Sequence, residues 1–437
     1  MTLSGALAIP RAEGVAAIRL VFCDLAGTAR TVWLPLCHLD RALAHGVAID
    51  PASAGVSDEH GADLLLRPDT STFRVWPAAA GIAASGLVLC RLTTLAGAPA
   101  ADDTRGVLEC VVDQCRRHGY ETLVGAELEY YYVRPSSGEP ADGGQYCEAS
   151  HRDACRAARQ ASVDVLSQMD VEIEYALHEC GPGQHEIVVG KRDAVRAADE
   201  VVIRKIVIRE IAAAHGLTAT FMPKPFAHLA GSGMHLHQSL RCEGEAILYD
   251  PDGLGGLSKL GQHFLAGQLG HTADMVLALA QWVNSYKRLG AGCAAPAAIT
   301  WGVENRSTLI RVPRARPEVP EDYRLEITAP DAAANPYLAI AAVLAAGLDG
   351  IDRQLVPPPP VNGDANELSD EELARLGCRR LPETLGDALR LAERSAFLAR
   401  LLGPELHARL IAEKRRHWRD HNTHVHPYER AQLLEIA

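Results

Sequence analysis

Residues 124–133, VGAELEYYYV, constrain this chain more than any other segment, because they place two carboxylates in an apolar stretch. Aromatic and β-branched residues predict a β-strand here, closed by Arg134 and Pro135. Side chains on a strand alternate between faces, so Glu127 and Glu129 point the same way, about 7 Å apart. Two like charges on one face are costly unless a cation or basic groups neutralise them. Taken alone, the segment fits an exposed edge strand equally well.

Three further segments carry side chains of the same kind. Glu179 is expected to end one strand and Glu186 to begin its antiparallel neighbour, so both carboxylates meet at the mouth of one hairpin. Residues 235–237, HLH, put two imidazoles on one strand face after a Gly-Ser-Gly turn, where backbone approaches a ligand closely. Glu326 adds a carboxylate on another apolar strand. Such oxygen-rich sets suit Mg²⁺ or Mn²⁺, which commonly clamp nucleotide phosphates, and this set has room for more than one ion.

A group of basic residues lies between the imidazoles and the last carboxylate: Lys287, Arg288, Arg306 and Arg311. Arg306 and Arg311 are far enough apart, along a turn and a strand, to bind different phosphates or carboxylates. The planar guanidinium suits this task because it bonds an oxyanion through two N–H groups at once. Surface ion pairs would be the better explanation if the acidic strands were absent.

Composition excludes several classes of function. The 437 residues are 48% hydrophobic and 22% charged, as in a globular protein with a sizeable core. A net charge of −12 without a Lys/Arg run argues against nucleic acid or an anionic membrane surface as a partner. No apolar run approaches the length of a membrane span, and the 11 cysteines form no Cys-x-x-Cys pair. We therefore expect free thiols and a cytoplasmic protein.

The order of the expected elements divides the chain in two. Residues 1–102 are predicted to form a small α+β unit, with strands at 17–23, 29–34 and 86–94. Residues 103–437 would form a larger domain in which the acidic strands alternate with helices. These helices are expected at residues 104–118, 151–169, 193–215, 257–283 and 336–351.

Several short motifs together resemble the glutamine synthetase family. They are ELE at 127–129, GPGQHE at 181–186, GSGMHLH at 231–237, NSYKR at 284–288, NR at 305–306 and NPYL at 335–338. They occur in family order and at family-like spacing. The resemblance implies an α+β fold, with a β-grasp N-terminal domain and a catalytic domain whose sheet is mostly antiparallel and flanked by helices. It also implies self-association into a double-ring dodecamer with active sites between subunits.

The resemblance assigns functions to individual positions. One Mg²⁺ or Mn²⁺ ion would be held by Glu129, Glu179 and Glu186, and a second by Glu127, His235 and Glu326. ATP would contact His237, Ser239, Arg306 and Arg311, and the amino-acid substrate would contact Gly231 and Arg288. Asp50 would reach the nitrogen-nucleophile site of a neighbouring subunit, and Asp50 and Arg306 would serve catalysis. The implied reaction is ATP-dependent amide formation, in which an acid attacks the γ-phosphate to give an acyl phosphate and an amine displaces phosphate.

Departures from the family pattern concern the substrates. Ala294 stands where glutamine synthetases carry a flap glutamate that helps to deprotonate and enclose ammonium. We therefore expect a larger amine, as in the γ-glutamylpolyamine and γ-glutamylamide synthetases. Thr328 replaces an arginine that contacts the carboxylate being activated, so a related acid is an alternative to glutamate as the expected substrate. Further departures are Ala230 for asparagine, Glu321 for an ATP-contacting lysine, and Arg379 for a tyrosine adenylylated in some bacterial members.

Two alternatives remain open. The chain could be a true glutamine synthetase that uses ammonia, or a non-catalytic relative kept as a ring-forming structural or nucleotide-sensing protein. Thr328, Ala230 and Glu321 favour the non-catalytic alternative. The complete set of metal-type side chains argues against it, because unused clustered carboxylates would destabilise the fold by mutual repulsion.

Overall fold

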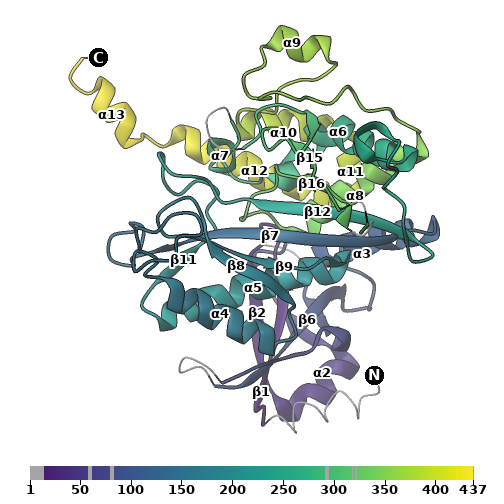
Figure 1. Ribbon diagram of the computed structural model, residues 1–437. Coiled ribbons are helices and arrows are strands. Elements are labelled where there is room, and N and C mark those ends of the chain that lie inside the picture. Colours follow the sequence, from purple (N-terminus) through teal and green to yellow (C-terminus); the bar gives the residue numbers. More distant parts are fainter. Residues whose placement is uncertain are drawn as a thin grey trace.

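A computed structural model describes residues 14–57, 62–78, 83–290, 295–316, 318–319 and 322–436. Figure 1 shows a small N-terminal sheet at one end of the molecule and a second, longer sheet with helices packed around it. Strands and helices are mixed along the chain, which confirms the expected α+β class. Ala294 and Glu321, two of the departures from the family pattern, lie outside the described residues. No helix within these ranges is both long enough and apolar enough to pass through a membrane.

The N-terminal sheet has six strands around one small helix, α2 (Leu39–His45). The strands are β1 (Ala17–Cys23), β2 (Ala29–Pro35), β3 (Val47–Ile49), β4 (Leu64–Pro68), β5 (Arg74–Trp76) and β6 (Ser85–Thr94). Their order is β2-β1-β6-β4-β3, with β5 also paired to β6, and only β1 and β6 run parallel. Ile18, Leu20 and Leu66 are fully buried on the face of this sheet that α2 covers.

The turn between β1 and β2 attaches the N-terminal sheet to the segment around Asn335. Gly27 has a φ of 82°, and a Cβ there would lie 2.8 Å from the Cα of Asn335, so only glycine fits. Asn335 donates to the carbonyl of Asp24 over 2.9 Å and caps α8 (Pro336–Asp352) with its side-chain oxygen. Residues 311 positions apart are therefore fixed together.

The large sheet has ten strands and is built around the long strand β7 (Glu121–Val133). Its main order is β14-β15-β16-β12-β7-β9-β8, and β14 with β15 is its only parallel pair among the described residues. The other strands are β8 (Ile173–His178), β9 (Gln184–Val189), β10 (Arg192–Asp193), β11 (Thr218–Thr220), β12 (Met234–Cys242), β13 (Glu245–Ala246), β14 (Trp301–Val303), β15 (Ile310–Val312) and β16 (Leu325–Ile327). A mostly antiparallel catalytic sheet was expected, and the structure confirms it.

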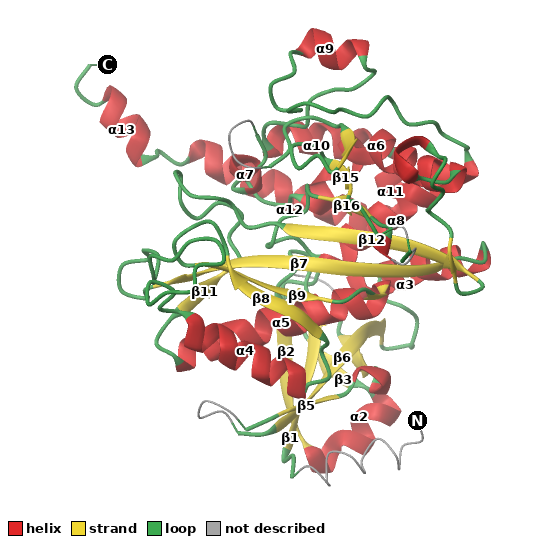
Figure 2. Ribbon diagram, viewed as in Figure 1, coloured by secondary structure: helices red, strands yellow, loops and turns green. Residues whose placement is uncertain are grey.

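Helices surround the large sheet (Figure 2). They are α3 (Thr104–Arg117), α4 (Arg156–Gln168), α5 (Ala194–Ala214), α6 (Lys259–Leu279), α7 (Ser285–Arg288), α8, α9 (Asp370–Arg375), α10 (Leu385–Arg394), α11 (Ala396–Leu402), α12 (Pro404–Thr423) and α13 (Pro427–Leu433). α5 packs on β7, whose residues Leu128, Tyr130 and Tyr132 are buried in the core. Burying each such side chain contributes about 1.5–3 kcal/mol, which fixes the opposite face of β7 toward the site.

Two expected helices differ at their ends. The helix expected from residue 151 begins at Arg156, because Asp142 and Asp153 bind the preceding turn. The helix expected to reach residue 283 ends at Leu279, where Ala280 turns to an extended φ of −139°. β6 ends at Thr94 and α3 begins at Thr104, while a domain boundary between residues 102 and 103 stays a prediction.

Candidate functional site

A cavity of about 1360 Å³ opens on one face of the large sheet. Ten of the expected site residues line it: Glu127, Glu129, Glu179, Glu186, Gly231, His235, Arg288, Arg306, Arg311 and Glu326. The volume accommodates a nucleotide together with a small second ligand. The structure thus brings the acidic strands, the imidazole strand and the arginines to one space.

Strand register explains this convergence. His235 lies opposite Glu127 in the β12–β7 pair, and Glu186 lies opposite Glu129 in the β9–β7 pair. Arg311 lies opposite Glu326 in the β15–β16 pair. Directly opposed residues of an antiparallel pair share one face of a sheet, so these side chains project together.

Glu127, His235 and Glu326 form the tightest group. Their ligand atoms lie within 4.8 Å of one another. Nδ1 of His235 is 3.3 Å from Oε2 of Glu127 and 3.6 Å from Oε1 of Glu326. Burial opposes charge on Glu127, but hydrogen bonds with His235 and His237 hold the pKa of Glu127 well below its usual range. Burial likewise acts against the charge of His235, while Glu127, Glu129 and Glu326 raise its pKa.

Glu129, Glu179 and Glu186 line the cavity without forming a group as tight as the first. Oε2 of Glu129 accepts the Gly233 N–H over 2.6 Å, and Oε2 of Glu179 accepts the Cys180 N–H over 3.0 Å. Oε1 of Glu186 is buried and has no hydrogen-bond partner among the described residues. Burial and then the charges of Glu127, Glu129 and Glu179 raise the pKa of Glu186 to about 10.

These donors fit divalent cations with a preference for oxygen. The unpartnered oxygen of Glu186 would coordinate such an ion. The positive charge of the ion would offset the neighbouring negative charges that raise the pKa of Glu186. Glu127, His235 and Glu326 supply two carboxylates and one imidazole, which also suits Mg²⁺ or Mn²⁺. Both expected sets therefore have the right chemistry, and which ion each would hold stays a prediction.

The arginines differ in what they contact. Arg311 donates from Nε to Oε2 of Glu326 over 2.7 Å. Arg288 is almost fully buried and donates to the carbonyls of Thr328 and Ala329 over 2.9 and 3.1 Å. Arg306 lies in the loop before β15, on the cavity wall. Arg311 therefore contacts Glu326 directly, and a terminal nitrogen of Arg288 lies 3.4 Å from Nε2 of His235.

Glycines let the backbone approach Arg288. A Cβ at Gly231 would lie 2.7 Å from Cγ of Arg288, and a Cβ at Gly233 would lie 2.6 Å from its terminal nitrogen. Ala230, which stands in place of the family asparagine, lines the cavity next to this turn and accepts the Tyr131 hydroxyl through its carbonyl. Close backbone approach therefore serves both the turn and the arginine.

Three expected site residues do not line the cavity within the described chain. Nδ1 of His237 accepts from Arg324 over 2.9 Å, so its Nε2 carries the proton that faces Glu127 at 2.7 Å. Ser239 accepts from Nζ of Lys191 over 3.0 Å and donates to the carbonyl of Tyr323. Asp50 is exposed after β3, in the N-terminal sheet. Their expected contacts with ATP and with a neighbouring active site stay predictions.

Some cavity residues were not predicted. Arg324 lies two residues before Glu326, and the two-residue period of a strand would have placed both on one face. Glu304, Asp364 and Glu367 add carboxylates to the wall, but they come from loops that give no periodic signal. The hydroxyl of Thr328, at the position of the family arginine, lies 3.2 Å from the carbonyl oxygen of Leu309.

Comparison with protein families identifies one match. The family described as glutamine synthetase, catalytic domain, matches residues 101–433. Glutamine synthetase of Mycolicibacterium smegmatis is 37% identical over 428 residues, covering 96% of this chain and 96% of that protein. Glutamine synthetase of Thermus thermophilus is 37% identical over 429 residues, with the same coverage of both.

Solved structures give the same answer for the fold. A structure described as a GmaS/ADP complex superimposes with a TM-score of 0.88 and is 30% identical, covering 98% of this chain and 99% of that chain. A crystal structure of a glutamine synthase homologue has a TM-score of 0.83 and is 29% identical, covering 94% and 96% of the two chains. The similarity therefore extends over both sheets.

Proposed function

Because the chain belongs to the glutamine synthetase family of ATP-dependent ligases, we propose that it joins a carboxylic acid to an organic amine through an acyl phosphate. The observation that carries this proposal is the convergence of carboxylates, one imidazole and arginines on a single large cavity. Glutamate or a related acid is the proposed acid, and a polyamine or a monoamine is the proposed nucleophile.

The arrangement of charges supports phosphoryl transfer. Arg306 and Arg311 would orient ATP with His237 and Ser239, because guanidinium groups bind phosphate oxygens in pairs. Mg²⁺ or Mn²⁺, held by Glu127, Glu129, Glu179, Glu186, His235 and Glu326, would neutralise charge on the phosphates. Arg288 and Gly231 would hold the acid, whose carboxylate takes the γ-phosphate. Deprotonation of the amine by Asp50 of a neighbouring subunit would then allow it to displace inorganic phosphate.

The departure from the family pattern at Ala294 is what favours an organic amine over ammonia. Ala294 supplies a methyl group at the position where the family resemblance expects a glutamate that encloses ammonium. The cavity wall includes Asp364, Glu367 and Glu304, the last paired with Arg314 over 3.4 Å, and these carboxylates suit a positively charged nucleophile of either kind. The competing function is glutamine synthesis from ammonia, which is favoured by the relatives named glutamine synthetase at 37% identity.

Release of phosphate from ATP tests these functions. The purified protein should release phosphate with Mg²⁺ or Mn²⁺, glutamate and particular amines, but little with ammonia. Release with ammonia alone would establish the competing function. Absence of release with every acid and amine, while nucleotide still binds, would contradict the ligase proposal and support a non-catalytic protein.

We also propose a ring oligomer, most simply a dodecamer, with active sites between subunits. Asp50 supports this proposal because it is exposed on the N-terminal sheet instead of lining the cavity of its own chain. Light scattering should give a mass about twelve times that of the 46.9 kDa chain. Asp50→Ala should lower turnover without changing that mass, and a fully active monomer would contradict the shared site.

A further inference from the structure

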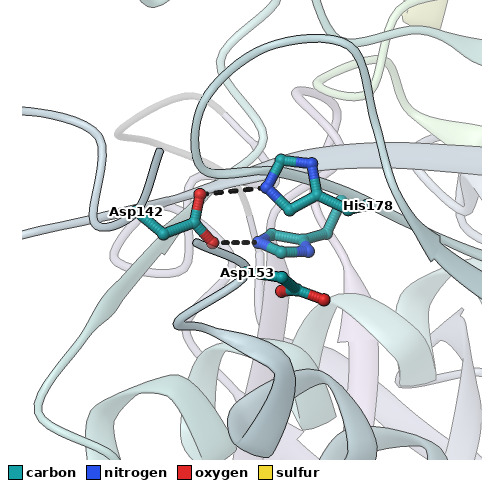
Figure 3. Close-up of side chains that lie close together, drawn as sticks. Asp142, Asp153 and His178 are labelled. Carbon is teal, nitrogen blue, oxygen red and sulfur yellow. Dashed lines mark hydrogen bonds and ion pairs between the residues drawn. The ribbon is translucent and has the colours of Figure 1, made fainter. Parts of the chain in front are cut away.

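A second cluster of titratable side chains lies behind the hairpin that carries Glu179 and Glu186. It consists of Asp142, Asp153, His178 and His185, and all four residues are buried. Figure 3 shows the carboxylate of Asp142 bonded to the ring of His178, with Asp153 beside them. The cluster is separate from the residues that line the cavity in the described chain.

The four side chains of this cluster are spaced like the ligands of a metal site, but hydrogen bonds already occupy the lone pairs that would bind an ion. Nδ1 of His185 lies 2.7 Å from a terminal nitrogen of Arg159, and a guanidinium only donates. Nδ1 of His185 therefore accepts, and the ring proton sits on Nε2, which faces Asp142 at 3.4 Å. Arg159 also binds both oxygens of Asp153, over 3.1 and 2.6 Å. A cation would have to displace these bonds, so the cluster is a hydrogen-bond network.

His178 donates from both ring nitrogens. Its Nδ1 lies 2.7 Å from the carbonyl oxygen of Glu179, which only accepts. Its Nε2 lies 2.9 Å from Oδ1 of Asp142, which already accepts the N–H of Gly183 over 2.7 Å and of Gly144 over 3.2 Å. An oxygen that accepts two N–H groups carries no proton of its own, so Nε2 of His178 also donates to it. A ring that donates from both nitrogens is an imidazolium, and His178 is therefore paired with Asp142.

This ion pair fixes both sides of the β8–β9 turn. His178 holds the main chain of Glu179 through a bond to its carbonyl oxygen. Asp142 holds the N–H of Gly183, in the turn just before β9, and Glu186 is the third residue of that strand. The backbone packs closely against His178, because a Cβ at Gly144 would lie only 2.4 Å from Nε2 of His178. At Gly183, which has a φ of 74°, a Cβ would lie 2.7 Å from the carbonyl oxygen of Tyr132.

We propose that Asp142 and His178 are positioning residues that set the divalent-cation affinity of the site by holding the hairpin of Glu179 and Glu186 in place. The inference rests on the metal site of the proposed function. Groups that orient metal ligands from behind typically contribute about 10–100-fold in metal affinity. Neither residue needs to touch a substrate, because each acts through the main chain of the hairpin.

The test measures Mn²⁺ binding directly, by titration calorimetry on the full-length protein. Asp142→Asn keeps the size of the side chain but removes its charge and presents an N–H to one of its two imidazole neighbours. We expect the Mn²⁺ dissociation constant to rise about 10–100-fold. Turnover by Asp142→Asn should recover when the Mn²⁺ concentration is raised. Recovery is expected because the change weakens metal binding, which raises the KM for Mn²⁺ and leaves kcat unchanged.

Asp199→Asn is the matched control. Asp199 is also a buried carboxylate in an ion pair, bound by Arg105 over 2.9 Å and by the Tyr337 hydroxyl over 2.7 Å, away from the hairpin. It should lower the melting temperature but leave the Mn²⁺ dissociation constant at the wild-type value. Equal Mn²⁺ affinity in Asp142→Asn and the wild type, or equal weakening in both variants, would overturn the proposal.

A second variant covers failure of Asp142→Asn to fold. In His178→Gln, the glutamine side chain can replace only one of the two bonds that the imidazolium donates, so Mn²⁺ binding should again weaken. Unchanged Mn²⁺ binding in this variant would overturn the proposal. The wild type separates this inference from the proposed function. Wild-type Mn²⁺ binding without turnover of any acid or amine would end the ligase proposal while leaving the positioning result intact. A wild type that binds no Mn²⁺ would end both.

Discussion

Arg311 and Glu326 face each other across β15 and β16, with Nε of Arg311 2.7 Å from Oε2 of Glu326. A terminal nitrogen of Arg311 contacts the same carboxylate oxygen. The family resemblance gives one residue to ATP and the other to a metal ion. With these roles, the two binding sites would share a charged pair, so a change in either residue should affect both ligands.

Arg311→Lys tests this shared pair. Lysine keeps the charge but presents a single ammonium group, so it loses the planar contact with Glu326 and with phosphate. We expect the KM for ATP to rise about tenfold or more. Arg316→Lys serves as the control, because Arg316 forms a surface pair with Asp322 outside the cavity. An unchanged KM for ATP in Arg311→Lys would remove Arg311 from the nucleotide site.

Glu129→Ala should abolish turnover while the oligomer keeps its mass. In the metal-free protein two effects on stability oppose each other, because the change relieves repulsion between like charges but removes the acceptor of the Gly233 N–H. In the wild type, Mn²⁺ at 100 times its dissociation constant should add about 2.7 kcal/mol of stability. EDTA should reverse this gain, and Glu129→Ala should show little of it. Activity that survives Glu129→Ala would refute the metal assignment.

Asp103 gives the metal-free protein a pH dependence of stability. Burial raises the pKa of Asp103 from 3.8 to about 6. Between these pH values the folded state binds more protons than the unfolded state, so the free energy of unfolding falls as pH rises. Asp103→Asn keeps the size of the side chain, which makes no capping hydrogen bond to α3, but does not titrate. Its melting temperature relative to the wild type should therefore rise by roughly 2–4 °C from pH 4 to pH 6.

The pH range above 6, in which the difference in melting temperature should no longer change, is an internal control. Between pH 7 and pH 8 both Asp103 and asparagine at this position keep a fixed charge, so the difference between the two proteins should stay constant. Scanning fluorimetry in EDTA measures both intervals. A difference that does not change between pH 4 and pH 6 would show that Asp103 is not held in its protonated form by burial.

Two glycines on α6 should respond in opposite ways to alanine. A Cβ at Gly267 would lie 2.1 Å from the carbonyl oxygen of Ala346 and 2.7 Å from backbone atoms of Gly350 on α8. Because backbone cannot move aside cheaply, Gly267→Ala should cost about 1–3 kcal/mol or more. Gly270 has nothing within 4 Å of its Cβ position, so Gly270→Ala should stabilise the protein by up to about 1 kcal/mol. Urea unfolding of both variants measures the contrast, and equal effects would contradict the α6–α8 packing.

Local chemistry explains what could be predicted for the strands. Alternation along residues 124–133 is enough to put Glu127 and Glu129 on one face, since each side chain follows from its own backbone position. The strand that contains His235 and the short strand around Glu326 were predicted for the same reason. The order of the motifs along the chain predicted the family, which the comparisons confirm.

The sequence alone determined the types of most elements, the shared face of Glu127 and Glu129, and the family. Only the tertiary structure decided which strands are neighbours, and therefore that Arg311 meets Glu326 and that Asp142 meets His178 from 36 residues away. The physical reason is that periodicity is a property of the local backbone. Pairing, by contrast, depends on which distant surfaces bury one another, and the ends of α4 and α6 shifted with those contacts.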